Sequence, residues 1–154
     1  MEFTRKTFEA QPYLYVAKEC SYEGSAIADA MGSAFGDVFG FVGQSGISPL
    51  SMPITVYHGM DPNTLRFQSG VFVTQEDADK ATGTVKAGLL PAGDAMTTTH
   101  VGPYSNMNQS HGALWKHMED EGIAGTMPVW EIYIDDPDKT DEANLRTEIY
   151  RAIS

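Results

Sequence analysis

The sequence predicts an α+β fold built from two tandem repeats, each with the order strand, strand, helix, strand, strand. Two observations lead to this prediction: landmark residues recur at a nearly constant spacing, and both halves show the same succession of alternating and helical apolar patterns. At 154 residues the chain has the size of one domain, or of two small halves that share a core. We assign repeat one to residues 1–75, a polar connector to residues 76–83 and repeat two to residues 84–154.

Landmark residues of the first half return in the second half in the same order. Helix residues return 76 positions later, as Met31 and Met107 show (107 − 31 = 76), whereas a Met-Pro pair returns after 75 positions. An ordered series of this kind through both halves indicates a duplicated unit. The pairs are Met31 and Met107, Met52-Pro53 and Met127-Pro128, Asp61-Pro62 and Asp136-Pro137, Leu65-Arg66 and Leu145-Arg146, and Tyr22 and Tyr104.

Each half shows the same succession of elements. Apolar residues at helical spacing predict helices over 27–42 and 107–118, and Gly46 and Gly122 suit left-handed helix ends. The segment from Pro91 to Asp94 predicts a turn between two strands, and the last two strands of each half are predicted to form a hairpin. The predicted strands are 3–9, 13–19, 54–58 and 65–73 in the first half, and 84–90, 95–101, 129–134 and 145–153 in the second.

A helix on one face of an antiparallel sheet leaves the other face in need of cover. We therefore expect antiparallel sheets whose two halves are related by a pseudo-twofold and cover each other. Small-molecule sites prefer interfaces between structural units. The seam between the halves is thus the predicted place of a ligand cleft.

The composition narrows the classes of function. The chain carries 10 Lys and Arg against 21 Asp and Glu, a formal charge of −11, and the basic residues are scattered. Direct nucleic-acid binding is therefore not expected. The acidic field favours cationic small molecules, although it also serves solubility. A homodimer or a protein partner is compatible with this composition.

Cysteine usage and apolar runs indicate the compartment. The single cysteine, Cys20, excludes an intramolecular disulfide and a CxxC redox site, and small apolar packing accounts for it. The first residues lack the apolar core of a signal peptide, and no apolar run reaches membrane-spanning length. We expect a cytoplasmic protein that does not enter the membrane.

One carboxylate stands in an otherwise apolar strand. Strand alternation over 129–134 places Val129, Glu131 and Tyr133 on one face, so Glu131 is expected to be partly buried. A buried carboxylate needs a partner, a proton or a ligand. A salt bridge to a basic residue or a solvent-exposed strand edge would also account for it. The repeat comparison favours function, because the 75-residue offset places Val56 at the matching position.

Aromatic side chains accompany this carboxylate in the sequence. A well-placed ring stabilises a cation by about 0.5 to 2 kcal/mol. Trp115 belongs to the apolar helix stripe, which favours core packing, and Trp130 points away from Glu131, so packing is an alternative role for it. The predicted ligand-binding set is Glu131, Tyr104, Tyr133, Tyr150, Tyr15, Trp130 and Trp115, with Tyr15 and the two tryptophans as its weaker members.

The remaining polar residues give no further signature. The four histidines do not have a metal-ligand spacing, and His111 replaces Phe35 of the first repeat, which favours a packed core histidine. Glu148 either enters the cleft beside Tyr150 or pairs with a neighbouring arginine. The chain lacks GxSxG, P-loop and GxGxxG motifs. We predict no metal and no cofactor.

Four segments together resemble the GyrI-like, or effector-binding, domain family. They are Leu90-Pro91-Ala92-Gly93, His100-Val-Gly-Pro-Tyr104, Pro128-Val-Trp-Glu-Ile-Tyr133 and Thr147-Glu-Ile-Tyr150. The resemblance covers nearly the whole chain and implies a paired-repeat α+β fold. In that family the domain senses drugs within multidrug-responsive transcription regulators, or occurs as standalone proteins that include a gyrase-inhibitory type. A subset hydrolyses cyclopropane-containing genotoxins.

The resemblance implies roles for individual residues. Glu131 resembles the pocket carboxylate that meets cationic drugs, and Tyr104, Tyr133 and Tyr150 resemble pocket-lining positions. The chain differs from the regulators because it shows no helix-turn-helix region, so we do not expect it to bind DNA alone.

Three functions follow as hypotheses. The favoured one is a standalone domain that senses or sequesters amphipathic, cationic or planar compounds. The enzymatic alternative uses Glu131 as a general base and Tyr104 or Tyr133 as proton donor to an opening ring. The third is an acidic interaction protein of the gyrase-inhibitory type.

Overall fold

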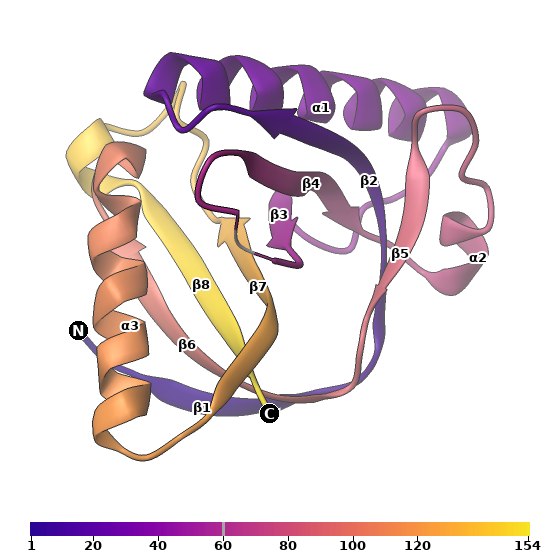
Figure 1. The fold of residues 1–154 in the computed structure, drawn as a ribbon. Helices are drawn as coiled ribbons and strands as arrows, with labels where there is room; N and C mark the ends of the chain where they lie inside the picture. Colours follow the sequence, from indigo (N-terminus) through magenta and orange to yellow (C-terminus); the bar gives the residue numbers. More distant parts are fainter. Residues whose placement is uncertain (60) are drawn as a thin grey trace.

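The computed structural model describes residues 1–59 and 61–154, which form one antiparallel sheet of eight strands together with three helices (Figure 1). All eight predicted strands and both predicted long helices are present, and the connector contains a short additional helix, α2. The elements are β1 (Thr4–Phe8), β2 (Gln11–Cys20), α1 (Gly24–Ser45), β3 (Ile54–Tyr57), β4 (Leu65–Phe72), α2 (Gln75–Ala78), β5 (Lys86–Leu90), β6 (Gly93–Val101), α3 (Met107–Asp120), β7 (Gly125–Tyr133) and β8 (Arg146–Ile153).

Both long helices end as their sequences predict. Gly46 follows α1 with φ 65°, and Gly122 follows α3 with φ 69°. Only glycine adopts this left-handed conformation at low cost, which ends each helix. Neither helix, nor any other helix of the described residues, is long and apolar enough to cross a membrane.

The sheet order is β1-β6-β8-β7-β3-β4-β2-β5. Exchanging each strand with its counterpart in the other repeat, β1 with β5, β2 with β6, β3 with β7 and β4 with β8, reverses this order. The order therefore reads the same from either end, as a duplicated unit requires. The α+β class is confirmed, but the halves share one sheet rather than forming separate sheets, because β3 of the first hairpin pairs with β7 of the second. The repeat boundaries remain a prediction.

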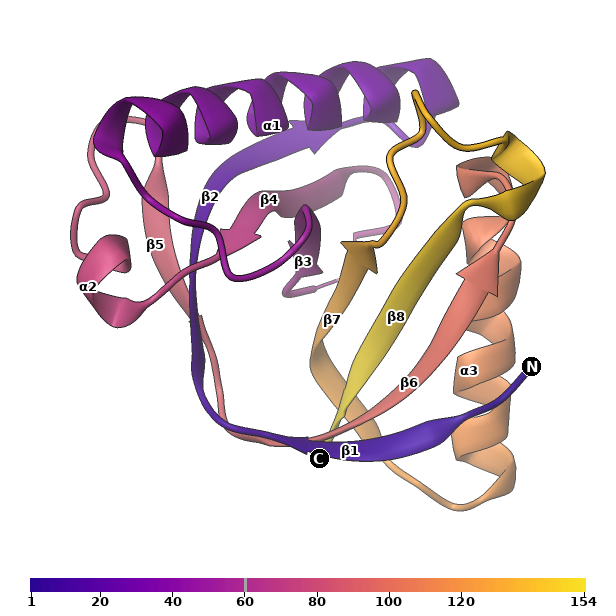
Figure 2. The same cartoon turned by 180° about the vertical axis from the view of Figure 1, so that it is seen from behind.

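The first two strands of each repeat do not pair with each other. β1 pairs with β6 and β2 pairs with β5, and one antiparallel register runs from Thr4 opposite Thr97 to Tyr15 opposite Lys86. The turn predicted from Pro91 to Asp94 thus closes no hairpin, and instead joins two strands that continue one bent ribbon. Figure 2 shows this ribbon curving around the open side of the sheet. The repeats are linked by exchanged strands as well as by the central β3–β7 pair.

Both long helices cover the same face of the sheet. α1 packs on β2 and β4 through a core that includes Leu14, Val38 and Val71, and α3 packs on β6 and β8 through one that includes Leu114 and Ile149. The opposite, concave face carries a third cluster rich in aromatic rings. Its members come from both repeats: Tyr13, Ile54, Val56, Leu90, Ala95, Trp130 and Tyr150. The sheet therefore covers its second face by its own curvature.

Gly70 marks the tightest approach between strands. A Cβ added there would overlap the Leu14 carbonyl oxygen of the neighbouring strand, whereas one added at Gly36 on α1 meets open space. We predict that Gly70→Ala lowers the free energy of unfolding by about 3 kcal/mol. Gly36→Ala should raise it by about 0.5 to 1 kcal/mol because alanine favours the helix. Thermal denaturation of both variants tests this, and equal melting temperatures would contradict the strand register.

Candidate functional site

Glu131 lies in the middle of β7, on the face of the sheet that the two long helices cover. Its residue is only 5 % exposed, and its cross-strand neighbours are Thr55 on β3 and Ile149 on β8. Strand alternation places Tyr133 on the same face. The carboxylate is thus held near the sheet centre, at the seam where the two repeats meet.

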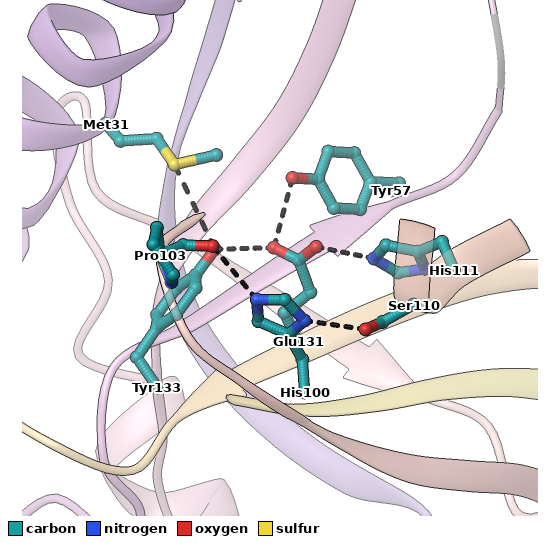
Figure 3. A network of polar contacts seen from close by, with 8 residues as sticks. All are labelled: Met31, Tyr57, His100, Pro103, Ser110, His111, Glu131 and Tyr133. Carbon is teal, nitrogen blue, oxygen red and sulfur yellow. Dashed lines mark hydrogen bonds and ion pairs between the residues drawn. The ribbon is translucent and has the colours of Figure 1, made fainter. Parts of the chain in front are cut away.

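Three side chains hydrogen-bond the carboxylate (Figure 3). Tyr133 donates its hydroxyl to Oε1 at 2.6 Å, and Tyr57 donates to the same oxygen at 3.2 Å. His111, from α3, places Nε2 2.7 Å from Oε2. Donors from two strands and one helix therefore compensate the burial of Glu131. The basic partner considered from the sequence is a histidine.

The structure corrects the position that corresponds to Glu131 in the first repeat. Thr55, not Val56, pairs with Glu131 across the seam, and Val56 belongs to the concave face. Thr55 also lies 76 residues before Glu131 (131 − 55 = 76), which is the offset of the helices. A register shift in β7 between Gly125 and Val129, next to the Met-Pro landmark, accounts for the 75-residue offset found there.

The corrected offset changes the meaning of the comparison. Thr55 is fully buried and its hydroxyl lies 2.9 Å from that of Ser69. The matching position of the first repeat is therefore polar, so the argument that an apolar residue suffices there is wrong. The two equivalent residues face each other across the seam, and one of them carries a charge.

The same offset shows that the two tyrosines are equivalent residues (133 − 57 = 76). Each repeat thus supplies one phenol to a single carboxylate oxygen. The helices break this symmetry, because His111 stands where the first repeat has Phe35 (111 − 35 = 76). His111 is accordingly a partner of Glu131 rather than the packed core histidine that we expected.

Burial and the nearby negative charge act on both phenols. Burial raises the pKa of Tyr57 and of Tyr133 well above the usual range of a phenol, and the negative charge of Glu131 is the next largest cause. Both groups therefore stay protonated at neutral pH. They act as hydrogen-bond donors to the carboxylate.

Apolar and aromatic groups from α1 and the loop before α3 surround Tyr133. Its ring meets the Phe35 ring edge-on at 6.0 Å and the Tyr104 ring at 5.6 Å, and its hydroxyl lies 3.9 Å from Met31 Sδ. Tyr104 is 39 % exposed. We call Met31, Phe35, Tyr104 and Tyr133 the aromatic wall. Its contacts connect the partly exposed Tyr104 with Tyr133, which bonds the buried carboxylate.

A second buried network supports the helix that carries His111. His100, on β6, has Nδ1 2.6 Å from the Ser110 hydroxyl and Nε2 2.9 Å from the Pro103 carbonyl oxygen (Figure 3). Because that carbonyl accepts the proton on Nε2, Nδ1 accepts from Ser110. The hydrogen bond between His100 and Ser110 holds the first turn of α3 against the sheet. Ser110 directly precedes His111 in the sequence.

The structure divides the aromatic residues predicted from the sequence. Tyr133 bonds Glu131, and Tyr104 contacts the Tyr133 ring. Trp130 and Tyr150 stack on each other at 5.1 Å on the concave face, where Tyr15 also packs. Tyr150 donates to Glu148 at 3.0 Å there, so this second carboxylate does not reach Glu131. Trp130 precedes Glu131 by one residue and is paired with Tyr150, so strand alternation places both on the face opposite to Glu131.

Trp115 packs in the α3 core, with the Arg151 guanidinium 4.4 Å from its ring centre. Two concavities, of about 580 and 240 Å³, lie elsewhere on the protein and are not lined by Glu131. Among the residues that the structure describes, no three His, Cys, Asp or Glu side chains are grouped as metal ligands would be.

Sequence reasoning missed Tyr57 and misinterpreted His111. Both carried a signal at the 76-residue offset, since Tyr57 matches Tyr133 and a histidine replaces a phenylalanine on a helix face. The 75-residue offset of the Met-Pro pair concealed the first match.

Comparisons with known proteins agree with the sequence resemblance. The profile of the GyrI-like small molecule binding domain matches residues 1–154, which confirms that resemblance. A search of curated proteins finds no match.

Similar solved structures share the fold. The EcmrR C-terminal domain is 22% identical with a TM-score of 0.72 and covers 99% of this chain and 97% of its own. A hydrolase from Listeria innocua is 17% identical, with a TM-score of 0.68 and coverage of 99% and 92%. SAV2435 bound to tetraphenylphosphonium is 12% identical, with a TM-score of 0.66 and coverage of 100% and 94%. At these identities the likeness establishes the fold alone.

The raised phenol pKa values predict alkaline sensitivity. An unfolded tyrosine ionises near pH 10. Because the folded-state pKa values of Tyr57 and Tyr133 lie higher, their contribution to stability is complete below pH 10 and is lost as the pH rises towards them. Chemical denaturation from pH 8 to 11 should show falling stability, with a smaller fall in the Tyr57→Phe, Tyr133→Phe double variant. An equal fall in both proteins would contradict the assignment.

Proposed function

The chain belongs to the GyrI-like small molecule binding domain family, and from this premise we propose that it senses or sequesters an amphipathic, cationic or planar compound at Glu131. The observation that supports the proposal is a buried carboxylate in contact with an aromatic wall that is partly exposed at Tyr104. Aromatic faces and a desolvated carboxylate both attract cations that carry apolar groups. The family premise and this geometry support the same class of ligand.

A ligand that meets Glu131 has to compete with the protein's own donors. The Tyr133 hydroxyl offers a way to release the carboxylate, because Met31 Sδ, a weak acceptor, lies 3.9 Å away. Rotation of this hydroxyl towards Met31 would free one lone pair on Oε1. His111 would keep the other oxygen in place.

The charge of the whole chain supports the approach of a cation. A formal charge of −11 creates a negative potential that raises the local concentration of cations. SAV2435, which has a similar fold, was solved with tetraphenylphosphonium, a lipophilic cation. We carry this ligand class over to the present chain as part of the proposal.

Removing the charge of Glu131 tests the proposal directly. We predict that tetraphenylphosphonium binds the unmodified chain and that Glu131→Gln weakens binding about 10- to 100-fold, because a charge pair is lost while the shape of the side chain is kept. Isothermal titration calorimetry measures both affinities. The matched control is Glu148→Gln, which removes a carboxylate that also accepts from a tyrosine but lies on the concave face.

Two results would contradict the proposal. One is an unchanged affinity in Glu131→Gln, and the other is an equal loss in the Glu148→Gln control. Circular dichroism melting of both variants ensures that the comparison is made between folded proteins.

A second function, hydrolysis of a strained ring, is supported by the 2.6 Å contact between Tyr133 and Glu131. Glu131 would take a proton from water while the water oxygen bonds to a cyclopropane carbon and one ring bond breaks. A tyrosine would give its proton to the atom that receives the released electron pair and then regain one from Glu131. The sum is the addition of one water. Structural neighbours from Listeria innocua carry the name hydrolase.

Incubation with a cyclopropane-bearing alkylator separates catalysis from capture. Catalysis predicts that mass spectrometry finds many equivalents of the water-added product, that Glu131→Gln abolishes it, and that Tyr133→Phe slows it more than Tyr57→Phe, because Tyr133 lies closer to Oε1. Retention of one equivalent of intact compound would support sequestration alone. Turnover that survives in Glu131→Gln would refute this chemistry.

A further inference from the structure

His111 contacts Glu131 through Oε2, and its side chain is more exposed than the carboxylate. Its side chain is 18 % exposed, whereas that of Glu131 is 7 % exposed. The imidazole is therefore more open to solvent than the carboxylate that it contacts. Figure 3 shows the ring between Glu131 and α3, which carries it.

One nitrogen of His111 is committed and the other is available. Nε2 lies 2.7 Å from Glu131 Oε2, so in the neutral ring the proton is on Nε2 and donates to the carboxylate. Within the part of the chain that the structure describes, Nδ1 makes no hydrogen bond. In this neutral form, Nδ1 carries a lone pair that can accept a hydrogen bond from outside the protein.

The repeat gives the site one polar and one apolar side. Phe35 on α1 contacts Tyr133, and its equivalent on α3, His111, contacts Glu131. The two tyrosines are equivalent, so they do not distinguish the two sides. The difference between Phe35 and His111 therefore distinguishes the apolar side of the site, next to α1, from the polar side, next to α3.

We propose that His111 in its neutral form determines specificity: its Nδ1 accepts a hydrogen bond from an N–H or O–H group of the ligand, whose apolar rings lie against the aromatic wall. The ligand class is thus amphipathic molecules with a hydrogen-bond donor at the end opposite their ring system. This inference rests on the proposed binding function. It specifies how the ligand is oriented and which residue hydrogen-bonds its polar end.

Two matched probes test the inference. They are triphenylphosphonium cations with a 4-(hydroxymethyl)phenyl or a 4-ethylphenyl group, which have nearly the same shape and charge and differ in one hydroxyl. The chain should bind the hydroxymethyl probe about three- to tenfold more tightly than the ethyl probe, the effect of one net hydrogen bond. His111→Phe, which copies the first repeat, should abolish this preference while it still binds the ethyl probe.

The control variant is His117→Phe, on the same helix. His117 stacks on Phe3 at 4.3 Å between ring centres, an arrangement that phenylalanine preserves. This variant should keep the preference for the hydroxymethyl probe. A preference lost equally in both variants would overturn the assignment to His111.

A measurement on the unmodified chain covers the case in which His111→Phe does not fold. Long-range ¹H–¹⁵N correlation spectra report on each ring nitrogen. The hydroxymethyl probe should shift the Nδ1 resonance of His111, and the ethyl probe should leave it nearly unchanged. Equal shifts, or equal affinities of the unmodified chain for both probes, would overturn the inference and leave the proposed function standing. Binding of neither probe would overturn the proposed function and this inference with it.

Discussion

The antiparallel pairing of β3 with β7 is the constraint on which the rest of the structure depends. It joins the two hairpins into one sheet and sets Thr55 opposite Glu131. Because these two residues are equivalents in the duplicated sequence, the centre of the strand order falls between them. A side chain placed there is surrounded by both repeats at once. Glu131 can therefore be buried and still receive a donor from each half of the molecule.

The internal duplication that we infer from the sequence, followed by local change, would explain the composition of the site. The repeated unit contributes Tyr57 and Tyr133 in equivalent positions, which approach the same oxygen of the carboxylate. Substitution at two further pairs of positions then separates the halves, since a glutamate faces a threonine and a histidine replaces a phenylalanine. The paired phenols make a buried negative charge tolerable. The unpaired residues give the site its charge and its direction.

The sequence predicted the elements well and the contacts between them less well. Strand alternation and helical periodicity are local, so the eight strands, both long helices and the shared face of Glu131 and Tyr133 could be derived from the pattern. Strand pairing is not local: the exchange of β1 and β5 between the repeats leaves no mark in the periodicity. The fate of Tyr150 shows the consequence. The sequence predicts which residues of β8 share a face with Tyr150. Whether that face is also the face of Glu131 depends on the register between β7 and β8, in which Glu131 is paired with Ile149.

The donors around Glu131 also limit what a ligand can gain there. A carboxylate that already accepts three hydrogen bonds is stable without a ligand, so a bound cation adds only the difference between its own contacts and those it displaces. The larger part of the binding free energy then has to come from apolar surface against the aromatic wall. Rings of varied shape can meet that requirement, whereas a small hydrated cation cannot, because it has little apolar surface to bury. Under the proposed function, a donor-satisfied carboxylate beside aromatic rings would thus select amphipathic ligands over charge alone.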